Sequence, residues 1–213
     1  MDTKSRQINP YNEQYYITFL NYNDETLYLK PEMRSAMRHY EFTKLPAGEP
    51  MFFENGYRDE DLSKGVKRPI KNAHMAINYP VINDDIKKSL GEIGNNFFQL
   101  YPAVIVDDER NYHEGFWVFN IFEYMDVLDL ENCLIDNFES GQDEYAINEY
   151  YLSKKKIEAI PEKDRLVFMP EYSDFPHVMV HEKVVNVLKK HNVDTLNFVK
   201  VSDWAMGLQF LES

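Results

Sequence analysis

The sequence is poor in several residue types that particular classes of protein need. Cys133 is the only cysteine among 213 residues, which excludes an intramolecular disulfide and a cysteine-based zinc site and favours a reducing, cytoplasmic setting. Only 8 glycines are present, and no glycine-rich phosphate loop occurs. No apolar run approaches the roughly 18 residues of a transmembrane helix. The polar N-terminus does not resemble a signal peptide.

Catalytic and metal-binding motifs are also missing from the sequence. There is no Gly-x-Ser-x-Gly nucleophile elbow and no dinucleotide-binding fingerprint. The histidines are scattered, and His177 and His181 lie in the alternating sequence HVMVH, which is typical of a strand rather than of a metal-binding helix. Nothing beside Cys133 indicates a base that could activate its thiol. We therefore expect no catalytic residue, no metal, no cofactor and no enzymatic activity.

Basic residues are scarce in the middle third of the chain. Residues 81–150 carry 16 acidic and 3 basic side chains, which accounts for the whole net charge of −13. The segments on either side are neutral. Such a concentration of acid repels nucleic acid and anionic membranes and attracts basic proteins. The alternative is a solvated acidic face that only improves solubility.

The remaining pattern predicts many strands and few, short helices. Alternating or β-branched stretches predict strands, and a charged stretch ending at a proline predicts a short helix or turn. We expect strands at 15–22, 26–31, 51–54, 145–153 and 165–170, and the helix or turn at 154–161. The first two strands are candidates for a hairpin, and residues 41–72 are otherwise expected to be loops. The predicted class is α+β with mostly antiparallel sheets.

Two segments resemble each other and predict two strand–helix–strand units. The segment that starts at Val81 aligns with the one that starts at Met179 after a shift of 98 positions, without a gap. In each segment a strand end is followed by residues that can cap a helix, then by apolar residues at helical spacing. The helices are expected to begin near Asp84 and Glu182. Their expected buried residues are Ile86, Leu90, Val184 and Leu188.

The stretch 114–133, EGFWVFNIFEYMDVLDLENC, combines an aromatic run with carboxylates. The run FWVFNIF predicts a central strand that is covered on both faces, with Trp117 and Phe119 on one face and Asn120 on the other. A buried Asn120 needs hydrogen-bond partners and is expected to pin a neighbouring backbone. Asp126 and Asp129 could form an acid/base pair, but no basic group lies near them in sequence. An acidic turn after the strand is the favoured interpretation.

This stretch resembles a bacterial family that was first catalogued as a domain of unknown function. The family was later assigned to the immunity proteins of polymorphic toxin systems, of the immunity-eleven type. The matching positions are Trp117, Val118, Asn120, Asp126, Leu128, Asp129, Leu130 and Glu131. The segments VINDDIKKSL and LVFMPEYSDFPHVMVHEKVVNVLKKHNVDTLNFVKV also look similar to the family. The resemblance covers roughly residues 75–205, and Cys133 stands where the family often has serine.

The resemblance implies a cytoplasmic immunity protein that binds and neutralises a cognate toxin. A basic nuclease is one candidate partner, whereas nucleic acid and membranes are not expected partners, and the protein would be a monomer or a homodimer. An interaction or scaffold protein of a bacterial antagonism locus and a small enzyme that uses carboxylates remain alternatives. Residues 1–74 are expected to form a strand- and loop-rich region packed on an immunity-like domain at 75–213, unless 1–213 is a single domain.

Two acidic runs in the middle third are the expected toxin-binding residues. Both look exposed, because glycine or asparagine interrupts each run, and both flank the predicted central strand. The first run is Asp107, Asp108 and Glu109, with Glu114, and the second is Asp136, Glu139, Asp143 and Glu144. If they bind a basic partner, they should gather on one face and steer its association. Reversing the charges at Asp107, Asp108 and Glu109 is expected to slow that association with little effect on thermal stability.

Overall fold

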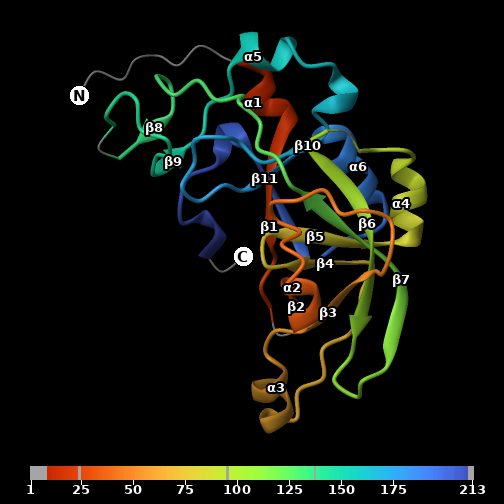
Figure 1. Cartoon of the computed structure of the whole chain (residues 1–213). Coiled ribbons are helices and arrows are strands. Elements are labelled where there is room, and N and C mark those ends of the chain that lie inside the picture. Colours follow the sequence, from red (N-terminus) through yellow and green to blue (C-terminus); the bar gives the residue numbers. More distant parts are fainter. Residues whose placement is uncertain (1–8, 24, 95, 137, 211–213) are drawn as a thin grey trace. The chain divides into compact units, whose positions relative to one another are not determined.

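The computed structural model describes residues 9–23, 25–94, 96–136 and 138–210 (Figure 1). The chain forms two compact units. One, called the barrel unit below, comprises the described residues of Phe19–Glu123 and Asn186–Asn197. The other, called the terminal unit, takes its described residues from Met1–Thr18, Tyr124–Val185 and Phe198–Ser213.

The barrel unit is a closed sheet of six strands with three short helices. The strands are β2 (Tyr28–Pro31), β3 (Met51–Asn55), β4 (Ala73–Ala76), β5 (Tyr79–Asn83), β6 (Phe98–Val106) and β7 (Tyr112–Ile121). The helices are α2 (Met33–Ala36), α3 (Arg58–Lys64) and α4 (Asp84–Leu90). The order around the barrel is β2-β3-β6-β7-β5-β4. The pairs β2–β4 and β3–β6 are parallel, and the other printed pairs are antiparallel.

Side chains of alternate residues fill the interior of this barrel. In β3, Met51 and Phe53 are fully buried, whereas Phe52 and Glu54, which alternate with them, are partly exposed, as the two-residue period of a strand requires. Val81 and Val118, which face each other across β5 and β7, are also fully buried. Burying a side chain of this size stabilises the fold by about 1.5–3 kcal/mol.

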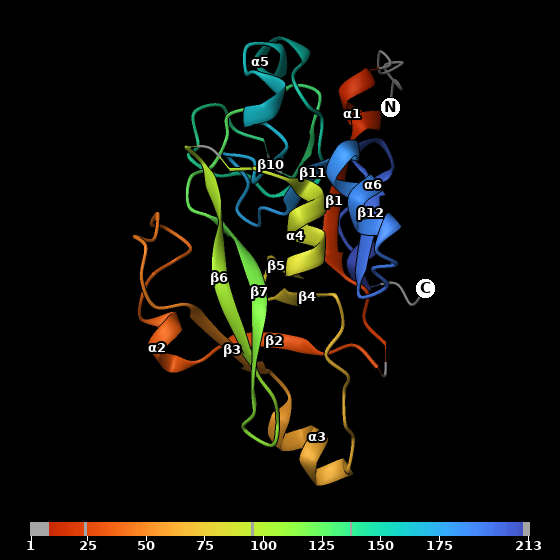
Figure 2. The ribbon, with the colours of Figure 1, turned by 90° about the vertical axis from the view of Figure 1, so that its right-hand side faces the viewer.

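Helix α4 covers the outer face of β7 (Figure 2). The Trp117 indole Nε1 donates a hydrogen bond of 2.6 Å to Oδ1 of Asp84, and the Lys87 ammonium lies 3.2 Å from the centre of the Trp117 ring. Asn83 caps the helix, because its side-chain oxygen accepts from the Ile86 amide at 3.1 Å. Trp117 therefore fixes the helix to the strand that carries the aromatic run.

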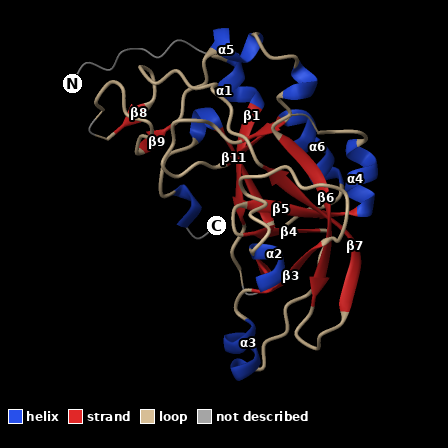
Figure 3. Cartoon of the chain, in the orientation of Figure 1, coloured by secondary structure: helices blue, strands red, loops and turns tan. Residues whose placement is uncertain are grey.

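The terminal unit has short strands separated by long loops (Figure 3). Its strands are β1 (Tyr15–Leu20), β8 (Leu134–Ile135), β9 (Ile147–Glu149), β10 (Val167–Phe168), β11 (Val178–His181) and β12 (Leu196–Lys200). Its helices are α1 (Pro10–Gln14), α5 (Lys154–Glu158) and α6 (Glu182–Lys190), with 3-10 turns at Glu162–Asp164, Val201–Asp203 and Leu208–Phe210. The main sheet has the order β10-β11-β1-β12, and β8 pairs with β9. The division between the units runs through β1, α6 and β12.

The predicted α+β class with mostly antiparallel sheets is confirmed, and both strand–helix–strand units are present. Helices α4 and α6 begin at Asp84 and Glu182, as expected. Ile86, Val184 and Leu188 are buried, whereas Leu90 is only half-buried. The likeness extends to the sheets, since β5 and β6 lie on either side of β7, and β11 and β12 lie on either side of β1.

Several expectations for the N-terminal third are wrong. Strands β1 and β2 do not form a hairpin, because they belong to different sheets. The segment 41–72 contains the helix α3 in addition to the predicted strand. The two compact units divide this part of the chain at another place, since the described residues up to Thr18 belong to the terminal unit and those from Phe19 to the barrel unit. The expected boundary at residue 74, with a single domain as its alternative, stays a prediction.

Candidate functional site

The two acidic runs lie in different units. The first run occupies the turn between β6 and β7 of the barrel unit and the start of β7. The second lies in the terminal unit, in the loop between β8 and β9. Glu109, Glu114 and the four carboxylates of the second run are exposed, as expected. Asp107 and Asp108 are partly buried, so the expected exposure is wrong for these two residues.

Asp107 organises the β6–β7 turn. Its carboxylate accepts hydrogen bonds from the amides of Glu109 at 2.9 Å and Asn111 at 2.8 Å. It also accepts from the Asn111 side chain at 3.0 Å and from Nε2 of His113 at 2.9 Å. These donors stabilise the charged form, so the pKa of Asp107 lies well below its usual range, with the bond from His113 as the largest cause. Asp107 is therefore a structural acceptor as much as a surface charge.

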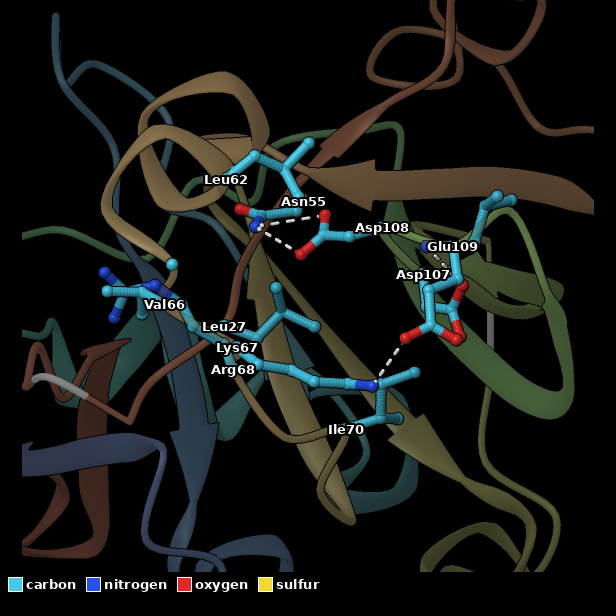
Figure 4. Close-up of a pocket in the computed structure, with 12 residues that line it drawn as sticks. Leu27, Asn55, Leu62, Val66, Lys67, Arg68, Ile70, Asp107, Asp108 and Glu109 are labelled. Carbon is cyan, nitrogen blue, oxygen red and sulfur yellow. Dashed lines mark hydrogen bonds and ion pairs between the residues drawn. The ribbon is translucent and has the colours of Figure 1, made fainter.

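A pocket of about 220 Å³ lies beside this turn, between α3, the loop 65–70 and the end of β6 (Figure 4). Leu27, Val66, Ile70 and Val106 contribute apolar walls. The other wall is polar and includes the three consecutive acids of the first run. The sequence patterns singled out those acids but not the pocket.

One wall of the pocket is held by a buried ion pair. Arg68 makes a two-pronged contact with Asp61, with Nε–Oδ2 at 2.7 Å and Nη2–Oδ1 at 3.0 Å. The Asn55 amide donates to the same carboxylate at 2.9 Å, and both Asn55 and Asp61 are 2 % exposed. The hydrogen bond from Arg68 is the main reason that the pKa of Asp61 is lowered. This fixed geometry anchors the loop that follows α3.

The rim of the pocket carries two further charged contacts. The Lys67 ammonium extends past the pocket to Oε1 of Glu109 at 2.7 Å (Figure 4). That bond raises the pKa of Lys67, and the nearby charges of Asp107 and Asp108 add to the effect. The two carboxylate oxygens of Asp108 each lie 3.4 Å from the Asn55 amide nitrogen. Within the described parts of the chain, Asp108 has no ion pair.

The second acidic run has a different environment. Asp136, Glu139, Asp143 and Glu144 make no hydrogen bond or ion pair with another described residue through their side chains. Two large apolar side chains accompany them, because Leu134 and Phe138 are each 48 % exposed. The Phe138 ring stacks on Tyr145, with ring centres 5.3 Å apart. We call residues 134–136 and 138–144 the acidic loop.

Three of the positions that carry the resemblance, Trp117, Val118 and Asn120, lie on β7 and have structural roles. Asn120 is fully buried and donates from Nδ2 to the Thr43 carbonyl at 3.2 Å, so it pins the neighbouring loop as predicted. Its Oδ1 has no hydrogen-bond partner among the described residues. Trp117 is only partly buried, whereas Phe119 and Val118 are buried, and β7 lies between β5 and β6 as a central strand.

The other motif residues form the acidic turn that the sequence favoured. Asp126 is paired with Lys156 at 2.6 Å. The Asp129 carboxylate accepts a hydrogen bond from the side-chain amide of Asn132 at 2.9 Å. Leu128 is fully buried and bridges to Leu152. Each carboxylate thus has its own local partner, and the structure does not pair the two acids with each other.

The histidines and Cys133 are engaged in packing and hydrogen bonds. His177 and His181 flank or end the strand β11, as the alternating sequence predicted. Cys133 is partly buried, and its sulfur accepts a hydrogen bond from the Tyr151 amide at 3.3 Å. No group of three or more potential metal ligands occurs in the described part of the chain. No helix there is both long and apolar enough to cross a membrane.

Comparison with family models and with curated proteins finds no match for this chain. No known family model matches the sequence, and no curated protein is significantly similar to it. The resemblance to immunity proteins, its functional implication and the cytoplasmic setting therefore stay predictions.

Proposed function

We propose that this chain is a non-catalytic cytoplasmic protein that binds and neutralises a basic toxin, as an immunity protein does. The observation that supports this most directly is the acidic loop. Four carboxylates are exposed there without a partner among the described residues, beside two half-exposed apolar side chains. Charges of this kind accelerate the encounter with a basic protein, and apolar side chains provide the desolvated contact that then holds it.

A solubility function explains this arrangement less well. Carboxylates that only improve solubility need no apolar neighbours, whereas Leu134 and Phe138 are each 48 % exposed within the same short loop. Large apolar side chains at a surface are a feature of interfaces when they cluster with a polar rim. Binding would inhibit the toxin by covering its active site. A nuclease fits this charge, because its substrate site is basic.

The test is protection combined with binding kinetics. Proteins encoded by the neighbouring genes are expressed in a sensitive bacterium with and without the chain. For one that is toxic, its association with the purified chain is measured at several salt concentrations. Native protein should restore growth. Reversal of Asp136, Glu139, Asp143 and Glu144 to lysine should slow association by at least about tenfold at low salt and flatten its salt dependence.

A matched variant controls for net charge. Reversal of four other exposed acids, Asp59, Asp85, Glu92 and Asp203, changes the total charge equally without touching the acidic loop. It should leave most of the association rate intact. Equal slowing by both variants would show that only net charge matters, and binding without growth protection would favour a scaffold function over neutralisation.

A further inference from the structure

The pocket beside the β6–β7 turn has the chemistry of a site for one amphipathic cation. Its base is apolar, formed by Leu27, Ile70 and Val106, and its rim is acidic. A long basic side chain has the complementary form, with an apolar stem and a charged head. The cavity of about 220 Å³ is of the right order for one side chain, since an engineered cavity of about 150 Å³ holds benzene.

The charges around the pocket do not cancel. Asp61 is neutralised by Arg68, and Glu109 is paired with Lys67. The Asp108 carboxylate has only the two long contacts of 3.4 Å with the Asn55 amide. The Arg58 guanidinium donates to the Asp108 main-chain carbonyl at 3.1 Å, but no ion pair joins it to the carboxylate among the residues described. Asp107 accepts its hydrogen bonds within the turn. A negative field therefore remains at the rim, next to an apolar cavity.

Lys67 already places a cation at the acidic rim of this pocket. Its stem is part of the pocket lining, and its ammonium reaches Glu109 across the rim (Figure 4). Both side chains of this pair are largely exposed, at 79 % and 66 %. Exposed ion pairs contribute only about 0–1 kcal/mol, so an incoming cation can displace Lys67 at little cost.

We propose that this pocket receives a single lysine or arginine side chain of a bound protein. The stem of the incoming residue lies on Leu27, Ile70 and Val106, and its head binds Asp108 and Glu109 while Lys67 turns into solvent. The inference builds on the proposed function, because it supplies the anchor that a basic partner would use. Buried anchor residues of this kind, arginine above all, carry most of the energy at protein interfaces.

The direct test needs no partner protein. The ¹⁵N-labelled full chain is titrated with N-acetyl-arginine amide and followed by NMR, with N-acetyl-citrulline amide as the neutral analogue of the same shape. Arginine amide should give saturable shifts at the amides of residues 66–70 and 106–109, and citrulline amide should not. Lysine amide tests the second basic side chain in the same way.

Two variants sharpen the titration. Lys67→Ala removes the competing internal cation and should tighten arginine amide binding about two- to fivefold, consistent with an exposed ion pair. Asp108→Asn should weaken it about tenfold, because it removes the charge-assisted hydrogen bonds. Equal binding of citrulline amide, or native affinity in a folded Asp108→Asn protein together with no effect of Lys67→Ala, would overturn the proposal.

The toxin assay separates this inference from the proposed function. Asp108→Asn should mainly speed dissociation of the toxin, whereas reversal in the acidic loop should mainly slow its association. Native dissociation from the Asp108→Asn variant, with growth protection retained, would reject the pocket as the anchor and leave the proposed function standing. Saturable arginine amide binding without any neutralisation of the toxin would support the pocket and reject the proposed function.

Discussion

The two acidic runs, one in each compact unit, use their carboxylates in opposite ways. In the barrel unit, Asp107 accepts four hydrogen bonds and Glu109 is paired with Lys67, so both acids help to hold a turn. In the terminal unit, the acidic loop carries four exposed carboxylates that have no such partners among the described residues. Acidic runs that look alike in sequence therefore differ in what they do. The two runs differ in whether nearby backbone N–H groups donate hydrogen bonds to the carboxylates.

The largest expected effect is a loss of stability at low pH. Each unit contains a histidine that burial keeps neutral. Burial lowers the pKa of His74 in the barrel unit and of His177 in the terminal unit to about 4. In the unfolded chain the pKa of a histidine is near 6.5, so between about pH 6.5 and 4 the unfolded state binds more protons than the folded state. The free energy of unfolding therefore falls as the pH decreases through this range. The loss should reach about 2–3 kcal/mol for each histidine.

The two tryptophans let this pH effect be followed in each unit separately. Trp117 lies in the barrel unit and Trp204 in the terminal unit, so Trp204→Phe and Trp117→Phe variants each retain one reporter. Urea unfolding by fluorescence at pH 7.0, 5.5 and 4.5 should show falling midpoints at both reporters. A His177→Gln variant should flatten the response at Trp204 more than at Trp117. Identical curves under all conditions would mean that the units unfold as one.

The next largest loss of stability is expected on substitution of Asn120, the buried polar side chain of β7. Asn120→Ala removes the donor to the Thr43 carbonyl and should lower the free energy of unfolding by about 1–3 kcal/mol. Asn120→Leu is the matched variant, since it fills the volume and also removes the buried Oδ1 that has no partner among the described residues. It should cost less than the alanine variant. Equal stability of the alanine variant and the native protein in urea would refute the pinning role.

A smaller effect is expected at the β6–β7 turn. Asp107→Asn keeps the side-chain shape but loses the charge that its donors stabilise, and should cost about 1–2 kcal/mol at pH 7. Because the folded pKa of Asp107 lies below its ordinary value, this stabilisation is complete above about pH 5 and disappears as pH falls through the folded pKa. The native and variant unfolding curves should therefore converge in acid. Glu109→Gln, at an exposed pair, is the control with little change.

The smallest effect on stability is expected in the acidic loop. Lysine at all four of its acidic positions should change the free energy of unfolding by no more than about 0.5 kcal/mol, because these carboxylates have no partner among the described residues. Thermal unfolding monitored by circular dichroism measures this directly. A larger loss would show that the loop carboxylates stabilise the terminal unit, and the contrast between the two acidic runs would then disappear.

Local features of this fold could be predicted because their causes are local. The starts of α4 and α6 follow from adjacent caps: Asn83 accepts from the Ile86 amide at 3.1 Å, and Nδ1 of His181 accepts from the Lys183 amide at 3.2 Å. The burial of Asn120 followed from its place within an apolar strand. The acidic turn after β7 was also predicted, and its Asp129 is bound by the nearby side chain of Asn132, whereas the partner of Asp126 is the distant Lys156.

Pairing between distant strands had no local signal. The parallel pairs β2–β4 and β3–β6 join strands separated by helices and loops, and the expected β1–β2 hairpin was wrong for the same reason. The pocket depends on these pairings, since Asn55 at the end of β3 and Asp108 after β6 are brought together by them. Of its lining, the sequence had singled out only the acidic run Asp107, Asp108 and Glu109.

The pairing of β1 with β11 has a consequence for synthesis of the protein on the ribosome. Tyr15 pairs with His181, so about 160 residues must be added after the first strand before its partner exists. At the usual rates of translation that takes roughly 10–30 s. The strands of the barrel are complete once Ile121 has emerged, whereas the apolar segment YYITFL must wait. During that interval the apolar side chains of this segment lack the strand that pairs with it in the folded protein.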